Sequence, residues 1–279
     1  RILGEAALGR FGMAFATTEL LSKAGMLGFD NSIIPFLAPR VQAGDRHGAV
    51  SIVRRACSMA GFASTALAAV SVPVIAWLAI TRGYEAFSHG GAVMLLALPG
   101  IAVARVATGA SRSVLAMSSE FYSRGITETW VTTGVFVIAV ALGFRDVAPA
   151  LAVAVGTSAA AVVAWVLAMR ALQARLTPGT AASAHTSGPI PSAASAEPST
   201  WEMLRFSLPI AGSSLLTVLV MQADVLLLGA YVGRAPGVTA EAFGVFTAAT
   251  QVAGGLRKVR QVFDPIFAPV VASRAVSEN

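Results

Sequence analysis

The sequence predicts an all-α polytopic membrane protein, and the prediction rests on composition and charge. Hydrophobic residues make up 56% of the 279 residues and charged residues only 12%, whereas a soluble domain is about 25% charged. The mean hydropathy is +0.72, and several windows of about 20 residues lack the charge that a soluble helix would show. The long alternating segments of an outer-membrane barrel are absent from the sequence.

Seven membrane spans are expected, and polar turns separate them. They cover residues 9–37, 56–80, 92–116, 126–144, 147–170, 203–232 and 242–271. Residues 173–200 are rich in Ala, Ser, Thr, Pro and Gly, which is typical of a flexible linker. The chain then divides into an N-terminal lobe (1–172, five spans of an expected six), the linker, and the start of a C-terminal lobe (201–279, two spans). Because it begins with Arg1 in what reads as a loop, we expect a first span to be missing.

The basic residues fall mostly at span ends, so the net charge of +6 is explained better by topology than by nucleic-acid binding. Ten arginines lie on one side of the expected membrane and five on the other, and the positive-inside rule places the first group and the linker in the cytoplasm. The larger group is Arg40, Arg46, Arg54, Arg55, Arg112, Arg124, Arg170, Arg175, Arg205 and Arg274, and the smaller is Arg1, Arg10, Arg82, Arg145 and Arg234.

An internal repeat relates the first and seventh spans. Lys23, Phe29, Asp30, Pro35, Ala38 and Arg40 align at an offset of 234 residues with Arg257, Phe263, Asp264, Pro269, Ala272 and Arg274. Upstream, Gly9-x-Phe11 resembles Gly244-x-Phe246 with a shift of one residue. Both spans run outside to inside, so they are expected to be parallel repeats of the kind found in carriers.

Three groups of charged residues lie inside expected spans, where charge is costly and is usually kept for a function. In the first span, Glu19, Lys23 and Asp30 share one face if the helix is continuous. Lys23 then either lines a cavity or only pairs with Glu19, and Asp30 either joins the cavity or ends the helix near the surface. Arg105 of the third span is either an anion ligand or a structural partner of Glu19 or Asp224.

The sixth and seventh spans carry the other two groups. Ser207, Ser214, Thr217 and Asp224 form a polar stripe in which Asp224 has no local partner, so it is a candidate proton or cation site, or the partner of a base on a neighbouring span. In the seventh span, Asp264 offsets Arg260 and leaves Arg257 for an anion such as phosphate, which suits the arginine fork. Alternatively, this helix ends early and its charges reach the membrane surface.

Other site chemistry is not indicated. The single cysteine, Cys57, excludes an intrachain disulfide, and His47, His89 and His185 lie in loops without metal-binding spacing. We find no CxxC, HExxH, GxSxG or phosphate-binding glycine loop in the sequence. The sequence therefore predicts no cofactor, no metal and no enzymatic activity.

The runs RFSLPIAGSSLLTVLVMQADVLLLGAYVG (205–233) and FGVFTAATQVAGGLRKVRQVFDPIFAPVVA (243–272) resemble the polysaccharide-biosynthesis, or oligosaccharide-lipid, flippases. These belong to the multidrug/oligosaccharidyl-lipid/polysaccharide exporter superfamily. The opening LGEAALGRFGMAFATTELLSKAGMLGFDNSIIPFLA, followed by Gly44-Asp45, is similar to that family's second span and its cytoplasmic exit.

The resemblance implies a two-lobe, inverted-V architecture and alternating-access flipping of a polyprenyl-pyrophosphate-linked glycan across a bacterial inner membrane, for cell-surface polysaccharides such as lipopolysaccharide. It implies the lipid bilayer and glycan polymerase or assembly proteins as further partners. By position, Lys23, Arg257 and Arg260 would face the central cavity, and Asp224 matches the acidic position of that family's seventh span. We expect Arg105 to line the same cavity and Asp224 and Glu19 to couple the cycle to an ion. Asp264 and Asp30 are expected to form structural ion pairs. Two rivals remain: a cation-coupled drug exporter of the same superfamily, and a non-transporting scaffold for glycan assembly.

Overall fold

The computed structural model describes residues 4–82, 91–176 and 198–254, and these residues form helices and turns without a strand. The elements are α1 (Glu5–Gly25), α2 (Phe29–Gln42), α3 (Arg46–Arg82), η2 (Gly91–Ala97), α4 (Leu98–Ser113), α5 (Ser118–Glu120), η3 (Phe121–Glu128), α6 (Thr129–Ala141), α7 (Ala148–Arg175) and α8 (Thr200–Tyr231). A further helical segment covers residues 240–254. The all-α fold class predicted from composition is confirmed.

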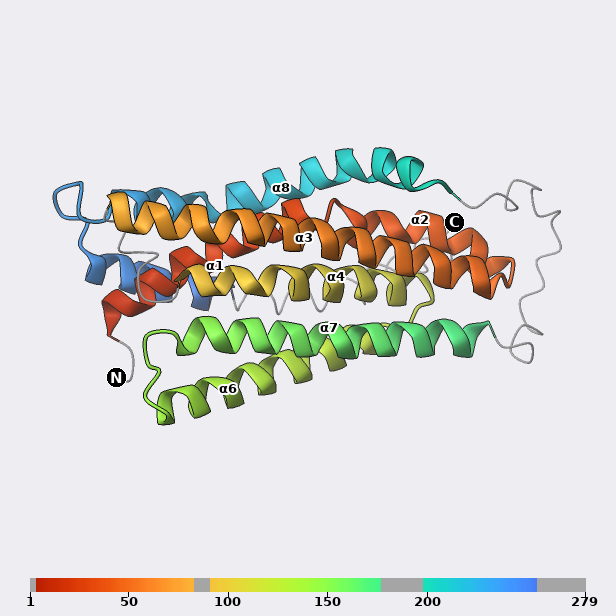
Figure 1. Cartoon of the computed structure of the whole chain (residues 1–279), viewed down its shortest axis with the longest axis horizontal. Coiled ribbons are helices and arrows are strands. Elements are labelled where there is room, and N and C mark those ends of the chain that lie inside the picture. Colours follow the sequence, from red (N-terminus) through yellow and green to blue (C-terminus); the bar gives the residue numbers. More distant parts are fainter. Residues whose placement is uncertain (1–3, 83–90, 177–197, 255–279) are drawn as a thin grey trace, which may run out of the picture.

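The long helices lie side by side along the long axis of the molecule (Figure 1). α4 is central and packs against α1, α2, α3 and α7, while α6 packs on the outer side of α7 and α8 packs on α1 and α2. α2, α4 and α7 end at the same end of the bundle at which α3 and α8 begin (Figure 1). This alternation gathers at one end nine of the ten arginines that the topology prediction assigns to one side of the membrane; the tenth, Arg274, lies outside the described residues.

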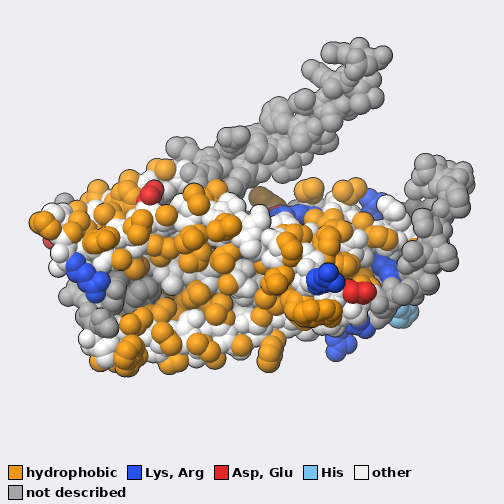
Figure 2. Space-filling model, turned by 90° about the horizontal axis from the view of Figure 1, so that it is seen from above, with side chains coloured by type: hydrophobic (Ala, Val, Ile, Leu, Met, Phe, Trp, Pro, Cys, Tyr) orange, Lys and Arg blue, Asp and Glu red, His pale blue; other side chains and the backbone are white. Residues whose placement is uncertain are grey.

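Four helical stretches are long and apolar enough to cross a membrane: Arg46–Thr81, Gly91–Ser113, Ala148–Arg175 and Thr200–Tyr231. In their most apolar windows, half of the residues of Gly91–Ser113 are buried but only 11% of those of Arg46–Thr81. An apolar helix that leaves this much surface exposed is suited to lipid or to further protein. Hydrophobic side chains cover most of the face in Figure 2, and charged side chains gather toward its two ends.

The predicted spans differ from these helices in three places. The first is divided between α1 and α2, and the fourth is formed by η3 and the 13-residue α6. The seventh is described only as far as residue 254, and the predicted linker lies largely in 177–197, outside the described residues. α7 continues to Arg175 and α8 begins at Thr200, so both extend into the range assigned to the linker.

The first predicted span is not one continuous helix. Leu27 and Gly28 have positive φ values of 52° and 77°, which end α1 and start α2 in a new direction. Gly28 lies against α8, where an added Cβ would be 2.7 Å from the backbone nitrogen of Ala211. Only glycine combines this left-handed conformation with so close an approach, so the position of the break is encoded by Gly28.

The turn between α2 and α3 has its own local code. Gly44, with φ of 70°, follows Ala43, the residue that caps the C-terminus of α2, as is common for glycine after a helix. Asp45 then caps α3: its Oδ1 accepts a 2.9 Å hydrogen bond from the Gly48 N–H, and Arg40 Nη1 donates to Oδ2 at 2.6 Å. The Gly48 N–H, and next the Arg40 guanidinium, lower the pKa of Asp45 from its ordinary value of 3.8.

Candidate functional site

Three helices bring polar side chains together around Glu19 of α1. Arg105 of α4 approaches the Glu19 Oε1 with its Nη2 at 3.5 Å, and Gln222 of α8 donates from Nε2 to the Glu19 Oε2 at 2.8 Å. The side chains of Arg105 and Glu19 are 20% and 27% exposed, so the group is neither dry nor fully solvated. The carboxylate of Glu19 therefore joins α1 to α4 and to α8.

A second charged pair lies at the break between α1 and α2. Lys23 Nζ donates to Asp30 Oδ2 at 2.7 Å, and both side chains are largely buried, with exposures of 13% and 11%. The prediction that Glu19, Lys23 and Asp30 share one face assumed an unbroken helix, and that helix is broken between α1 and α2. Because the chain turns at Leu27 and Gly28, Asp30 comes back toward Lys23, and Glu19 is left to partners from other helices.

α4 packs closely against the backbone of α2 at Asp30. The backbone of Gly109 lies so close to α2 that an added Cβ would be 2.5 Å from the Asp30 carbonyl oxygen and 3.2 Å from Ile33 Cγ2. Small residues at such crossings let helix backbones approach closely in a membrane.

We call the five polar residues of the two groups described above the charged cluster: Glu19, Lys23, Asp30, Arg105 and Gln222.

The pairing in the charged cluster is incomplete. Arg105 Nε and Asp30 Oδ1 are buried and have no hydrogen-bond partner in the part of the chain that the structure describes. The contact from Arg105 to Glu19, at 3.5 Å, is also longer than a strong charge-assisted hydrogen bond of about 2.7–2.9 Å. Arg105 thus keeps donor capacity for an additional acceptor.

The remaining predicted site residues lie outside this cluster. Asp224 is exposed, and no hydrogen bond or ion pair joins it to another described residue. It follows Gln222 by two residues, about 200° around the helix, so it lies on the opposite face of α8. The predicted polar stripe is divided: Ser207 is buried and meets Ser32 of α2 at 2.5 Å, whereas Thr217 is exposed. Arg257, Arg260 and Asp264 lie outside the described residues.

The described upstream parts of the two predicted repeats contact each other directly. An added Cβ at Gly9 of α1 would be 3.1 Å from the backbone nitrogen of Gly244, and one at Gly12 would collide with Thr247. Positions increase together along the two helices, so α1 and segment 240–254 run in the same direction. Parallel packing is the geometry that the predicted parallel repeats require.

Gln222 is the member of the charged cluster that sequence analysis missed. Its amide is neutral, and in the run VLVMQADVLLL only Asp224 is charged and was therefore chosen as a candidate. The available signal was its position: an amide in an apolar helix needs a hydrogen-bond partner inside a membrane. A neighbouring carboxylate such as Glu19 meets that need.

Comparisons with known proteins yielded no significant match among curated proteins or solved structures. One family model, described as polysaccharide biosynthesis protein, matches residues 1–259. Members of this family are in general membrane transporters or flippases that act in polysaccharide synthesis. The match covers far more than half of the chain and agrees with the apolar helices and the resemblance of its sequence runs, so the chain belongs to the polysaccharide biosynthesis protein family.

Proposed function

We propose that this protein flips a lipid-linked oligosaccharide across a bacterial inner membrane for cell-surface polysaccharide biosynthesis, by alternating access and without enzymatic chemistry. The observation that carries the proposal is the incompletely paired charged cluster between α1, α4 and α8. Ionisable groups at a junction between two repeats are the usual arrangement of a carrier site. The substrate is a polyprenyl-pyrophosphate-linked glycan whose lipid tail stays in the bilayer.

Arg105 and Lys23 provide positive charge on the N-terminal-lobe side of the site, and Arg257 and Arg260 provide it from the repeated helix. An arginine suits pyrophosphate because its planar fork donates parallel hydrogen bonds to two oxygens. Of the two described bases, Arg105 is the more available, since its Nε has no partner among the described residues whereas Lys23 pairs with Asp30. Asp264 offsets part of the charge on the repeated helix, as Asp30 does for Lys23.

Movement of Arg105 toward the substrate gives a route to ion coupling. Glu19 would then keep the hydrogen bond from Gln222 and lose its cation, and a carboxylate in that position needs a proton or metal cation as a replacement partner. Asp224, on the opposite face of α8, is the second candidate for this role. The linker is cytoplasmic in this arrangement, and glycan polymerase or assembly proteins act as partners, with no role for nucleic acid.

The test is a flipping assay in proteoliposomes with a polyprenyl-pyrophosphate-linked short glycan, read as the glycan fraction accessible to an external lectin. Loss of the Arg105 hydrogen bonds to pyrophosphate, worth about 1.5–3 kcal/mol for a charged group, should slow flipping at least tenfold in Arg105→Gln. Arg170→Gln removes an exposed charge from α7 and should leave the rate unchanged. Arg257→Gln with Arg260→Gln should abolish flipping.

Two outcomes would overturn the proposal. Undiminished flipping by Arg105→Gln and by the Arg257→Gln, Arg260→Gln variant, at equal protein levels, would remove the basic residues from the substrate path. Transport of a cationic dye that Glu19→Gln abolishes, with no glycan flipping by the wild-type protein, would identify a drug exporter. No transport of either compound by well-folded protein would favour the scaffold.

A further inference from the structure

α8 makes two different contacts, and they lie toward opposite ends of the helix. The first, at residues 206–211, is with α2 and the residue that precedes it. The second, at residues 225–229, is with α1 and the segment that follows α8. The charged cluster lies between the two contacts, because Gln222 reaches Glu19 there. The buried residues of α8 follow one narrow stripe: Met203, Ser207, Ala211, Val218, Val225 and Gly229.

The second contact is apolar and closely packed. Val225 belongs to a hydrophobic cluster with Met13 and Ala16 of α1 and with Phe243. An added Cβ at Gly229 would be 3.1 Å from Phe243 Cζ and would collide with Met13. Large side chains fitted against a glycine leave little room for one helix to shift on the other. This contact is therefore suited to be a fixed pivot.

The first contact is centred on a pair of hydroxyls. Ser207 is fully buried, and its Oγ lies 2.5 Å from Oγ of Ser32 in α2. Ser207 also donates to the Met203 carbonyl oxygen at 2.7 Å, and because a hydroxyl has one proton, Ser32 is the donor within the pair. If the two helices separate, Ser207 keeps the bond to its own helix. No donor of α8 is then left unpaired.

Two narrow contacts flank the hydroxyl pair. The Phe36 and Phe206 rings meet edge to face with their centroids 5.3 Å apart, and Phe206 is 48% exposed. Gly28 lies against Ala211, as described above. Glycine, serine and alanine bury little apolar surface, so separating them costs less than separating the larger side chains of the second contact. We call this first contact the seam: Gly28, Ser32 and Phe36 on one side, and Phe206, Ser207 and Ala211 on the other.

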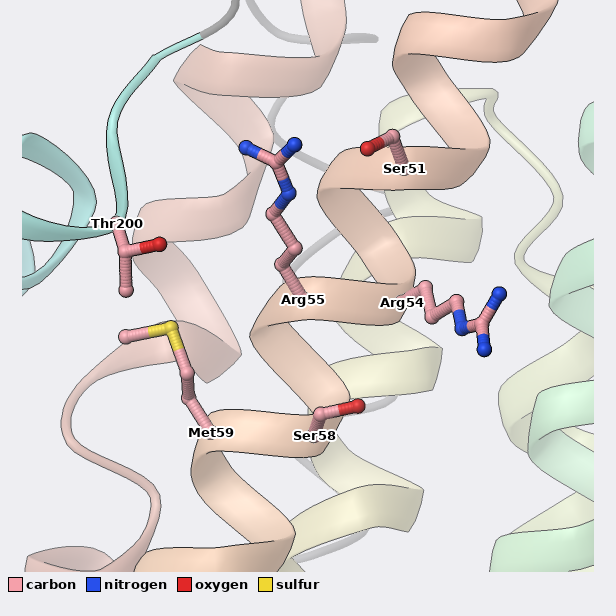
Figure 3. A pocket seen from close by; sticks show the side chains of 6 residues that line it. All are labelled: Ser51, Arg54, Arg55, Ser58, Met59 and Thr200. Atoms are coloured by element: carbon pink, nitrogen blue, oxygen red, sulfur yellow. The ribbon is translucent and has the colours of Figure 1, made fainter.

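Beside the seam, a cavity of about 390 Å³ lies between α3 and Thr200, the first residue of α8. Figure 3 shows Arg55 and Met59 extending from α3 toward the side on which Thr200 lies. One turn later, Met203 and, less deeply, Leu204 enter the main hydrophobic core. Methionine is unbranched and adapts to changed surroundings. The first turns of α8 are thus held by the seam and a few adaptable side chains.

We propose that the seam is a gate, closed in this structure, through which the charged cluster opens toward the end of the molecule at which α8 begins. α8 would swing away from α2 about the packed contact of Val225 and Gly229. α2 would stay in place, because Gly109 of α4 packs against its backbone at Asp30. The gate rests on the proposed function, since alternating access requires one contact to open while another holds.

The first experiment measures thiol accessibility to a membrane-impermeant maleimide in proteoliposomes, below the unfolding temperature. Ser207→Cys and a control, Ser111→Cys, are each made together with Cys57→Ala. Ser111 is also fully buried and bonds a carbonyl of its own helix, that of Ala107 at 3.2 Å, but it belongs to α4 and not to the seam. Ser207→Cys should react at least tenfold faster than Ser111→Cys. Ala211→Cys provides a second thiol in the seam and should react like Ser207→Cys.

The second experiment locks the seam. Ser32→Cys combined with Ser207→Cys places two thiols where the hydroxyls meet, so oxidation with copper phenanthroline should form a disulfide that stops flipping, and a reductant should restore it. The control pair is Gly61→Cys with Val103→Cys, which joins α3 to α4, where an added Cβ at Gly61 would be 3.3 Å from Val103 Cγ2. Its disulfide should leave the flipping rate unchanged.

The outcomes separate the gate from the transport activity. Labelling of Ser207→Cys and Ala211→Cys as slow as that of Ser111→Cys overturns the gate, as does undiminished flipping by the oxidised Ser32→Cys, Ser207→Cys variant. If the wild-type protein flips no glycan, the proposed function fails, and the labelling rates still decide whether the seam opens.

Discussion

The buried pair of Lys23 and Asp30 gives the sharpest stability prediction. At 2.7 Å and an effective dielectric constant of about 20, the Coulomb attraction is about 6 kcal/mol, and much of it offsets the desolvation of both ions. Lys23→Met leaves Asp30 only 8% exposed and without its cation, which should cost about 3–5 kcal/mol. At roughly 2–4 °C per kcal/mol, the apparent unfolding temperature should fall by about 6–20 °C.

The sole cysteine provides the assay. Cys57 is 5% exposed and belongs to the same hydrophobic core as Phe29 and Ile33 of α2, so a fluorogenic thiol reagent should react only as the protein unfolds. Asp30→Asn should also destabilise, because it leaves the Lys23 charge without its counterion. In the double variant Lys23→Met, Asp30→Asn, the loss should be smaller than the sum of the single losses by about 1–3 kcal/mol. Additive losses, or an unchanged temperature for Lys23→Met, would refute a coupled buried pair.

The remaining predictions use the same thiol assay. Gly109→Ala should lose about 1–3 kcal/mol because its Cβ meets α2, whereas Gly134→Ala, with open space around it, should be neutral or gain up to about 1 kcal/mol; equal effects would exclude the close helix crossing. Folding lowers the pKa of Asp45, so its stabilising contribution is present above its unfolded pKa near 3.8 and is lost as the pH falls through the folded value. The unfolding temperature of Asp45→Asn should therefore fall less below pH 4 than that of the wild type. Identical pH profiles of the two proteins would contradict this prediction. Gly12→Val should separate α1 from Thr247 and expose Cys57 to the reagent at a lower temperature, and an unchanged temperature would exclude this packing.

The helical class of this protein could be predicted because it depends on local composition. Long apolar runs such as those of α3, α7 and α8 allow few other structures in a membrane. The turn at Gly44 and Asp45 was also visible in the sequence, since glycine after a helix and aspartate at its start are local signals. The start of the break at Leu27 was not, because a leucine with positive φ has no sequence signature.

The partners in the charged cluster could be predicted only in part: Arg105 was one expected partner of Glu19, whereas Gln222 was not expected. Arg105 and Gln222 reach Glu19 across 86 and 203 residues, and helix packing rather than spacing decides that contact. Phase around one helix allowed a pair of Glu19 with Lys23, but Lys23 pairs with Asp30 instead. Because the chain turns at Gly28, Asp30 lies next to Lys23, at a position that the phase of a straight helix does not predict.

The contact of Gly9 with Gly244 makes two positions far apart in the sequence depend on each other. An added Cβ at Gly9 would be 3.1 Å from the backbone nitrogen of Gly244, and one at Gly244 would collide with the backbone of Glu5. Each glycine therefore sets how closely the other helix can approach. Enlarging either one alone would push α1 and segment 240–254 apart.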